Sequence, residues 1–275
     1  AEVEKEAEFT DASVIDDQGE YKDKITISGD KAIVSLKKTQ CKKEAEFTDG
    51  VVNIEDAEFT DKFTGEKLIL NIQKSEFQKE AELTNSSCVL IDCEFQKETT
   101  VEGCSVKIVK GKFQEDVEIT DGAWQSEKSE FEKKFTLTGS TLESVKDTFS
   151  DDVEISDIIF ENLIFKPDDG KKLTLSGKDE SASIRVYEWN GQDDIEIEKF
   201  GRFALINSEP EGKLTCSEVQ IGEFVKCSFQ KDVEISEAKL IILTETDSSQ
   251  KSDISQVQTL IWNSGELGQE ASLDN

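Results

Sequence analysis

A phenylalanine recurs every eighteen residues through the middle of this sequence, and this spacing limits the folds open to the chain. The repeat gives a ladder of Phe59, Phe77, Phe95, Phe113, Phe131 and Phe149. Most of these residues are followed, after four positions, by an apolar–polar–apolar triplet such as Val117-Glu118-Ile119. A fixed period near twenty residues is typical of solenoid proteins, in which successive repeats stack on one another.

Each repeat contains three short apolar stretches. In the repeat that begins at Phe113 these are Phe113 itself, then Val117 and Ile119, then Trp124. Alternation of apolar and polar residues indicates strands with one face inward and one outward. A helical repeat would need apolar spacings of three and four, and about thirty or more residues per unit. The sequence therefore predicts an all-β, three-sided parallel β-helix (a β-solenoid) of about 18 residues per coil and 13–14 coils.

The outward residue at the centre of the triplet alternates between Glu and Thr through thirteen coils. The middle of this outward column reads Glu82, Thr100, Glu118, Thr136 and Glu154. Stacked strands lie ~4.8 Å apart, so an unbroken column of Glu would set like charges directly opposite one another, which is destabilising. A Thr between them doubles the separation to ~10 Å, near the Debye length. The true unit is thus a two-coil super-repeat of about 36 residues.

The repeat predicts a single β-solenoid over residues 1–275. Regular coils are expected over 1–164, looser and more aromatic coils over 165–243, and a loop with a C-terminal strand or cap over 244–275. Three interruptions are predicted as loops because they are polar, contain Pro and Gly, or hold two extra residues. They are Lys37–Gln40, Phe165–Gly170 and Thr244–Asp253.

The net charge of −29 argues against nucleic acid as a partner, because phosphates require clustered Lys and Arg. It also disfavours an anionic membrane surface, and no apolar window is long enough to span a bilayer. Divalent cations or a basic partner are the natural counter-charges, although carboxylates on a solvated surface also keep a repetitive protein soluble.

The chain contains no histidine, which excludes Ser-His-Asp and Cys-His catalysis and His-containing zinc sites. Two cysteines occupy expected core positions, so buried free thiols are the leading interpretation. A disulfide among Cys88, Cys93 and Cys104 is the alternative. The six cysteines are Cys41, Cys88, Cys93, Cys104, Cys216 and Cys227.

Adjacent carboxylates are the remaining candidates for chemistry. A pair can supply a general acid and base, as in glycoside hydrolysis, or oxygen ligands for Ca²⁺. No EF-hand loop is present, so any calcium site should be weak or intermolecular. Such pairs are also expected by composition, since 61 residues are acidic. The pairs are Asp151-Asp152, Asp168-Asp169 and Asp193-Asp194, and the last four of these residues are weak candidates for metal ligands.

Two features suggest an extracellular or secretory compartment. The sequence contains no Met and begins at Ala1, as a mature product or a trimmed chain would. Asn85-Ser86-Ser87 is an N-glycosylation sequon at a predicted turn, with Asn85 as the acceptor.

These observations favour a non-enzymatic structural protein. We expect a subunit of an extracellular or secretory matrix, coat or filament that self-associates by stacking of coil ends or by cation bridges between acidic faces. One alternative is an adhesin-like module that binds a carbohydrate or a surface through the aromatic half around Tyr187, Trp189 and Phe203. A second alternative is a carboxylate-based enzyme acting on polysaccharides.

Overall fold

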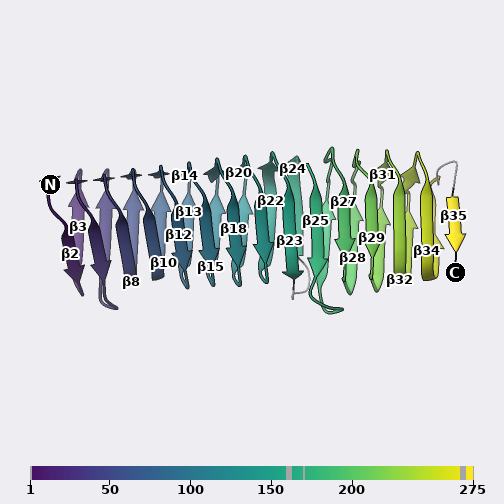
Figure 1. The fold of residues 1–275 in the computed structure, drawn as a ribbon, viewed down its shortest axis with the longest axis horizontal. Helices are drawn as coiled ribbons and strands as arrows, with labels where there is room; N and C mark the ends of the chain where they lie inside the picture. Colours follow the sequence, from purple (N-terminus) through teal and green to yellow (C-terminus); the bar gives the residue numbers. More distant parts are fainter. Residues whose placement is uncertain (1, 159–162, 170, 267–270, 275) are drawn as a thin grey trace. The chain divides into compact units, whose positions relative to one another are not determined.

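A computed structural model describes residues 2–158, 163–169, 171–266 and 271–274. It confirms the predicted fold class: the protein is an all-β parallel β-solenoid of about 14 turns, with stacked strands about 18 residues apart and no helix among the described residues. The contacts between residues divide the chain into two compact units, Ala1–Lys133 and Lys134–Asn275. Within each unit the strands lie side by side, coil on coil (Figure 1).

Each coil of unit 1 carries three strands, which we call the short, triplet and third strands. Every strand pairs in parallel with its counterpart on the next coil. The short strands are β1 (Glu2–Val3), β4 (Glu20–Tyr21), β7 (Gln40–Cys41), β9 (Glu58–Phe59), β11 (Glu76–Phe77), β14 (Glu94–Phe95), β17 (Lys112–Phe113) and β20 (Glu130–Phe131). The triplet strands are β2 (Ala7–Thr10), β5 (Ile25–Ser28), β12 (Ala81–Thr84), β15 (Thr99–Glu102) and β18 (Val117–Thr120). The third strands are β3 (Ser13–Asp17), β6 (Ile33–Lys37), β13 (Ser87–Ile91), β16 (Ser105–Val109) and β19 (Ala123–Glu127), while β8 (Ala45–Glu55) and β10 (Phe63–Gln73) join a triplet strand to a third strand.

The phenylalanine ladder forms the centre of this unit. The rings of Phe77 and Phe95 stack with centroids 4.7 Å apart and planes within 3°, and Phe95 and Phe113 stack at 4.8 Å and 5°. Phe59 and Phe131 continue the stack at 5.0 Å on either side. Each ring is buried. The eighteen-residue period is therefore the register of the parallel strands, as predicted.

The triplet strands bring the alternating Glu and Thr residues into one column. In unit 1 Thr64 and Thr100 pair with Glu82 from either side, and Thr100 pairs with Glu118. In unit 2 Thr136 pairs with Glu154. This register confirms the two-coil super-repeat within each unit.

The corners are built from a residue in the left-handed conformation followed by a small buried residue. Lys74 (φ 49°) precedes Ser75, and Asn85 (φ 50°) precedes Ser86. The Ser75 hydroxyl donates to the carbonyl of Gln73 and accepts the N–H of Ala57 on the preceding coil. This pairing satisfies backbone groups that a tight turn would leave without partners. Asp and Asn tolerate the left-handed region better than most residues, and they occupy it at Asp11, Asp49, Asn85, Asp121 and Asp157.

The two extra residues of the second coil do not lie at Lys37–Gln40, where the sequence interpretation placed them. Ala7 pairs with Ile25, but Ser13 pairs with Ile33, so the insertion precedes Ile33. It forms a turn in which the N–H of Ala32 donates to the carbonyl of Gly29. Gly29 has φ 107°, a conformation that favours glycine.

Unit 2 repeats the same plan. Its triplet strands are β21 (Phe135–Thr138), β23 (Val153–Ile158), β25 (Leu173–Gly177), β27 (Ile195–Glu198), β29 (Leu214–Ser217) and β35 (Ala271–Asp274). The other strands are β22 (Thr141–Phe149), β24 (Leu163–Asp169), β26 (Ser183–Tyr187), β28 (Arg202–Ile206), β30 (Ile221–Val225), β31 (Ser228–Phe229), β32 (Val233–Thr244), β33 (Asp247–Ser248) and β34 (Ser252–Trp262).

Two of the predicted loops are wrong in this unit. Residues 165–169 belong to β24, which pairs with β22 through register shifts next to Pro167. Proline has no backbone N–H, and such irregularities are where a sheet accepts it. The run Thr244–Asp253 is a further corner of the solenoid that holds β33, with the buried hydroxyls of Ser248 and Ser252 2.9 Å apart. The run was predicted as a loop because it is polar, but its Ser248 and Ser252 occupy buried positions.

Among the described residues no helix is long and apolar enough to cross a membrane.

Candidate functional site

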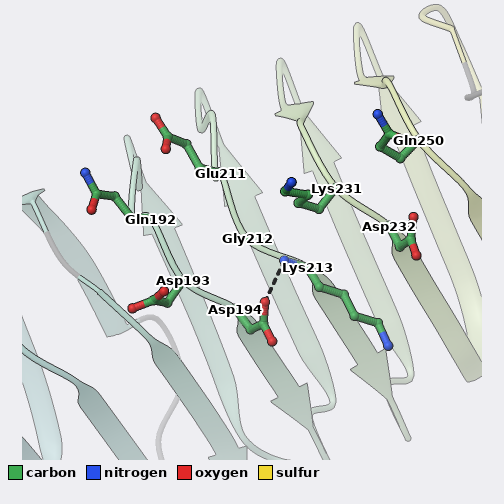
Figure 2. A pocket seen from close by; sticks show the side chains of 9 residues that line it. All are labelled: Gln192, Asp193, Asp194, Glu211, Gly212, Lys213, Lys231, Asp232 and Gln250. Carbon is green, nitrogen blue, oxygen red and sulfur yellow. Dashed lines mark hydrogen bonds between the residues drawn. The ribbon is translucent and has the colours of Figure 1, made fainter.

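A hollow of about 440 Å³ lies on one corner of unit 2, just before the triplet strands β27, β29 and β32. Its lining residues come from successive coils and are Gln192, Asp193, Asp194, Glu211, Gly212, Lys213, Lys231, Asp232 and Gln250 (Figure 2). Gly212 has no side chain to fill the space between Asp193 and Lys231. A Cβ atom at Gly212 would lie 2.0 Å from the carbonyl oxygen of Asp193, so the close approach of two backbones requires glycine here.

Three of the six charged side chains that line this hollow, those of Asp194, Lys213 and Asp232, already have structural partners. The Oδ1 atom of Asp194 accepts the backbone N–H of Lys213 at 2.8 Å, and Lys213 Nζ lies 2.7 Å from Glu234. Figure 2 shows the Lys213 side chain extending away from Gly212. The side chains of Asp193 and Lys231 make no hydrogen bond or ion pair within the described part of the chain. The Glu211 side chain makes none either, so the hollow offers two free carboxylates and one free ammonium group.

The predicted metal ligands do not gather into one site. Asp193 and Asp194 both line the hollow, but Asp194 braces the next coil. Asp168 and Asp169 lie on β24, and their side chains fall outside the described residues. Nowhere in the described part of the chain do three Cys, Asp or Glu side chains converge as metal ligands would. The carboxylates Asp151 and Asp152 are tied to a corner, where Asp151 accepts the N–H of Asp152 at 3.0 Å.

A second hollow, of about 410 Å³, lies on the corner that follows the triplet strands of unit 2. The amide of Gln220 donates across it to Glu180, two coils away, at 3.1 Å. Asp179 accepts the backbone N–H and the hydroxyl of Ser181, and these bonds lower the pKa of its carboxyl group. Lys178, Lys199, Glu218 and Glu237 complete the lining. The surface mixes both charges and is open to solvent.

The predicted aromatic binding surface is largely internal. Trp189, Phe200 and Phe203 are fully buried, and Phe203 packs against Phe224 with ring centroids 5.9 Å apart. Tyr187 is half-buried and points outward on β26. The extra aromatic residues of this half therefore fill the core, which leaves Tyr187 as the single member of the predicted set that can reach a ligand.

All six cysteines are buried and unbridged, as the leading interpretation predicted. Burial raises the pKa of the Cys41, Cys216 and Cys227 thiols to about 12 and that of Cys93 to about 11. No disulfide joins Cys88 to Cys104 on the next coil, and the interaction between the two thiols raises the pKa of Cys88 and lowers that of Cys104. The four thiols with a pKa of about 11 or 12 are neutral at pH 7, and a neutral, buried thiol is a poor nucleophile and a poor metal ligand.

The sequon is accessible at its acceptor. Asn85 is exposed at a corner, and Ser87 is exposed at the start of β13. Ser86 between them is buried, and its hydroxyl accepts the N–H of Leu68 at 3.0 Å.

The outward face of the triplet strands, which we call the triplet face, carries a row of ion pairs that was not predicted from the sequence. Two residues before most Thr positions of the outward column stands a lysine, and its ammonium group reaches the Glu of the following coil. The hydrogen bond to Glu82 raises the pKa of Lys62, and the corresponding bonds raise the pKa of Lys24, Lys172 and Lys213. The sequence contains this pattern. Of the six Thr positions from Thr26 to Thr215, five have a lysine two residues earlier, and only Thr100 has an acidic residue there, Glu98. The pairs are Lys24–Glu46, Lys62–Glu82, Lys134–Glu154, Lys172–Glu196 and Lys213–Glu234, with N–O distances of 2.6–2.9 Å.

The outward face of the third strands of unit 1 has a different character, and we call it the neutral face. It consists of the first, third and fifth residues of each five-residue third strand, from Ser13–Asp17 to Ala123–Glu127, together with the matching segments 51–55 of β8 and 69–73 of β10. Its charged residues are three carboxylates and two lysines, which leave one net negative charge in a chain of net charge −29. They are Asp17, Lys37, Glu55, Lys107 and Glu127.

Large apolar side chains are exposed on this face. Ile15 is 85% exposed, Ile33 55% and Ile69 56%, and the half-buried Val51 lies between Ile33 and Ile69 in the same column. The other large apolar side chains exposed among the described residues, Ile261 and Trp262, lie on a third strand of unit 2. The corresponding face of unit 2 holds Tyr187 and both arginines of the chain, Arg185 and Arg202.

Comparison with known proteins gives no match: no protein-family model, no curated protein and no solved structure is similar to this chain.

Proposed function

We propose that this chain is a non-enzymatic structural protein that builds a matrix, coat or filament by association with copies of itself. The observation that supports this proposal is the repetition of its outward surface. Each outward position of a coil recurs one strand spacing (~4.8 Å) along the unit, as the pairing of Glu82 with Thr100 and of Asn53 with Asn71 illustrates. A weak contact made by one coil can therefore be repeated by the next, and multivalent contacts add strongly.

The rigid packing beneath this surface suits a structural role. The stacked phenylalanine rings and the buried corner hydroxyls leave each coil fixed to its neighbours. Ion pairs between coils, such as Lys62–Glu82, hold the outer charges in register. An extracellular or secretory setting remains part of the proposal, supported by the exposed acceptor Asn85.

Cations are a second route to association. The triplet face of unit 1 carries uncompensated carboxylates around Glu98, and Ca²⁺ bound between two copies would cancel their repulsion. Such bridging should respond to calcium beyond the effect of equal ionic strength.

A glycan-binding module is the alternative. It could use Tyr187, but the rings of Trp189 and Phe203 are buried and do not reach a ligand. A polysaccharide-acting enzyme would have to use the free carboxylates Asp193 and Glu211 in the hollow beside Gly212. A titration of the purified chain with soluble glycans, followed by tryptophan and tyrosine fluorescence and by product release, tests both.

Sedimentation velocity and negative-stain electron microscopy test the main proposal. The full chain should form dimers or larger ordered assemblies at micromolar concentration, in chelator, in millimolar calcium and in sodium chloride of matched ionic strength. A monodisperse monomer under all three conditions would overturn it.

A further inference from the structure

We infer that the neutral face of unit 1 is a homodimer interface, on which a second copy of this chain docks through its own neutral face. This inference deepens the proposed self-association and rests on it. It names the surface, the partner and the arrangement.

The first argument is electrostatic. Two copies that each carry a net charge of −29 repel one another, and the repulsion is strongest where carboxylates face carboxylates. The neutral face has one net negative charge, and its Lys37 pairs internally with Glu55 at 2.9 Å. Contact through this face brings the fewest like charges together, because the acidic triplet faces then point away from the partner.

The second argument is the exposure of apolar surface. Ile15, Ile33 and Ile69 stand exposed on one face of a chain that is otherwise rich in charged residues. Half-buried Val51, Val89, Ile91 and Val109 extend the apolar surface over neighbouring coils. Exposed apolar side chains that gather on one face of a charged protein mark an interaction site. Association through the neutral face would remove these apolar side chains from water.

The third argument is area. Seven third strands of five residues, at ~4.8 Å between strands and ~3.3 Å per residue, cover roughly 34 Å by 17 Å. With a two-fold axis at Val51, on the third of these strands, five strands of each copy face one another and bury roughly 800 Å² in total, which is the size of a weak, transient interface and below the ~1,000 Å² of a stable one. The neutral face alone is therefore large enough for a weak dimer, which forms at high protein concentration.

The fourth argument is periodicity, which selects a second copy over another partner. A flat sheet whose side chains repeat every ~4.8 Å fits best against a sheet with the same repeat, and facing sheets pack ~10 Å apart. A two-fold axis along the strand direction at Val51 reverses the order of the coils. It sets Val51 against Val51, and Ile33 of one copy against Ile69 of the other, because these residues occupy successive positions of one column.

A pair of lysine substitutions on two faces of the same coils tests this interface. The variant Ile33→Lys/Ile69→Lys places four ammonium groups in the dimer interface, whereas Thr26→Lys/Thr64→Lys adds the same charge to the triplet face. All four positions point outward, so both variants should fold, which circular dichroism and thermal melting check. Sedimentation equilibrium should show the dimer dissociation constant of the isoleucine variant raised at least tenfold and that of the threonine variant changed less than threefold.

The outcomes separate the interface from the proposed function. If the natural chain associates and both variants associate equally well, the neutral face is not the interface and self-association through another surface stands. If the natural chain remains a monomer even at high salt, where screening favours apolar contact, self-association itself is wrong. A loss of association in the threonine variant alone would place the interface on the triplet face.

Discussion

The Nζ atom of Lys62 lies 2.7 Å from the Oε1 atom of Glu82, the second residue of strand β12 on the next coil. This pairing explains why the outward column alternates. Coils with Thr in the column carry Lys two positions earlier, and coils with Glu carry an acid there, as at Glu80 before Glu82. The alternation thus spaces the Glu side chains and also supplies five of them with a lysine partner. Among the coils from Thr26 to Thr215, the one exception is the coil of Thr100, which has Glu98 where the others have lysine.

Replacing Thr100 with Glu should destabilise unit 1. The new carboxylate would pair with Glu82 and Glu118 on either side, next to Glu98 and without a lysine. Like charges on facing strands cost roughly 0.2–1 kcal/mol per pair, so urea unfolding at low salt should show a loss of that order, which shrinks at high salt. Thr136→Glu is the matched control, because Lys134 stands beside it and should reduce the loss. Equal losses for both variants, or no dependence on salt, would contradict the electrostatic explanation.

Glu98→Lys should stabilise the protein. It restores the lysine that the other Thr-bearing coils up to Thr215 possess and places a cation between Glu80 and Asp116 in the same row, near Glu118. The melting temperature should rise at low salt, with Glu98→Gln giving a smaller rise because it only removes repulsion. An unchanged or lower melting temperature for the lysine variant would show that the row of ion pairs has no energetic role.

Phe95→Ala should be among the most damaging single changes in unit 1. The ring stacks against Phe77 and Phe113 at 4.7 and 4.8 Å, and truncation leaves a cavity between two coils. Loss of a buried phenylalanine costs about 3–5 kcal/mol, which equilibrium unfolding in urea can measure. Phe95→Leu keeps most of the volume and should cost clearly less. A loss under 1 kcal/mol for the alanine variant would be inconsistent with a tightly stacked core.

The native thiols should be almost inert. A pKa of about 12 for Cys216, against an ordinary value of 9.0, lowers its thiolate fraction about a thousandfold at neutral pH. A thiol-reactive reagent should label none of the six cysteines quickly in the native chain and all six after unfolding. Since burial favours the neutral thiol, this contribution to stability is intact below pH 9 and is lost as the pH rises toward 12. Fast native labelling would place a cysteine at the surface.

The sequence predicts the fold well because its most regular pattern is formed by residues whose side chains point into the core. Phe77 and Phe95 are spaced by one coil, and a constant spacing of buried rings fixes the register of every strand between them. The position of the extra residues in the second coil was not predictable in this way. Counting residues shows that the coil is longer, but only the backbone pairing of Ser13 with Ile33 shows where.

The surface features were harder to predict because they depend on residues from different coils. The hollow at Gly212 exists because its neighbours on adjacent coils, Asp193 and Lys231, carry side chains and it does not. The neutral face has no regular alternation along the chain. Ile33, Val51 and Ile69 form a column only after the register places them beside one another.

A distance between two copies tests the neutral-face dimer most directly. Because the native thiols are buried, a single Gln73→Cys substitution, at the exposed rim of the neutral face, accepts a spin label selectively. With facing sheets ~10 Å apart, pulsed electron paramagnetic resonance should give an intermolecular distance of about 15–30 Å for this label. A label at Thr64→Cys, on the triplet face of the same coil, should give a longer distance or none. A short intermolecular distance at Thr64 with none at Gln73 would contradict the account.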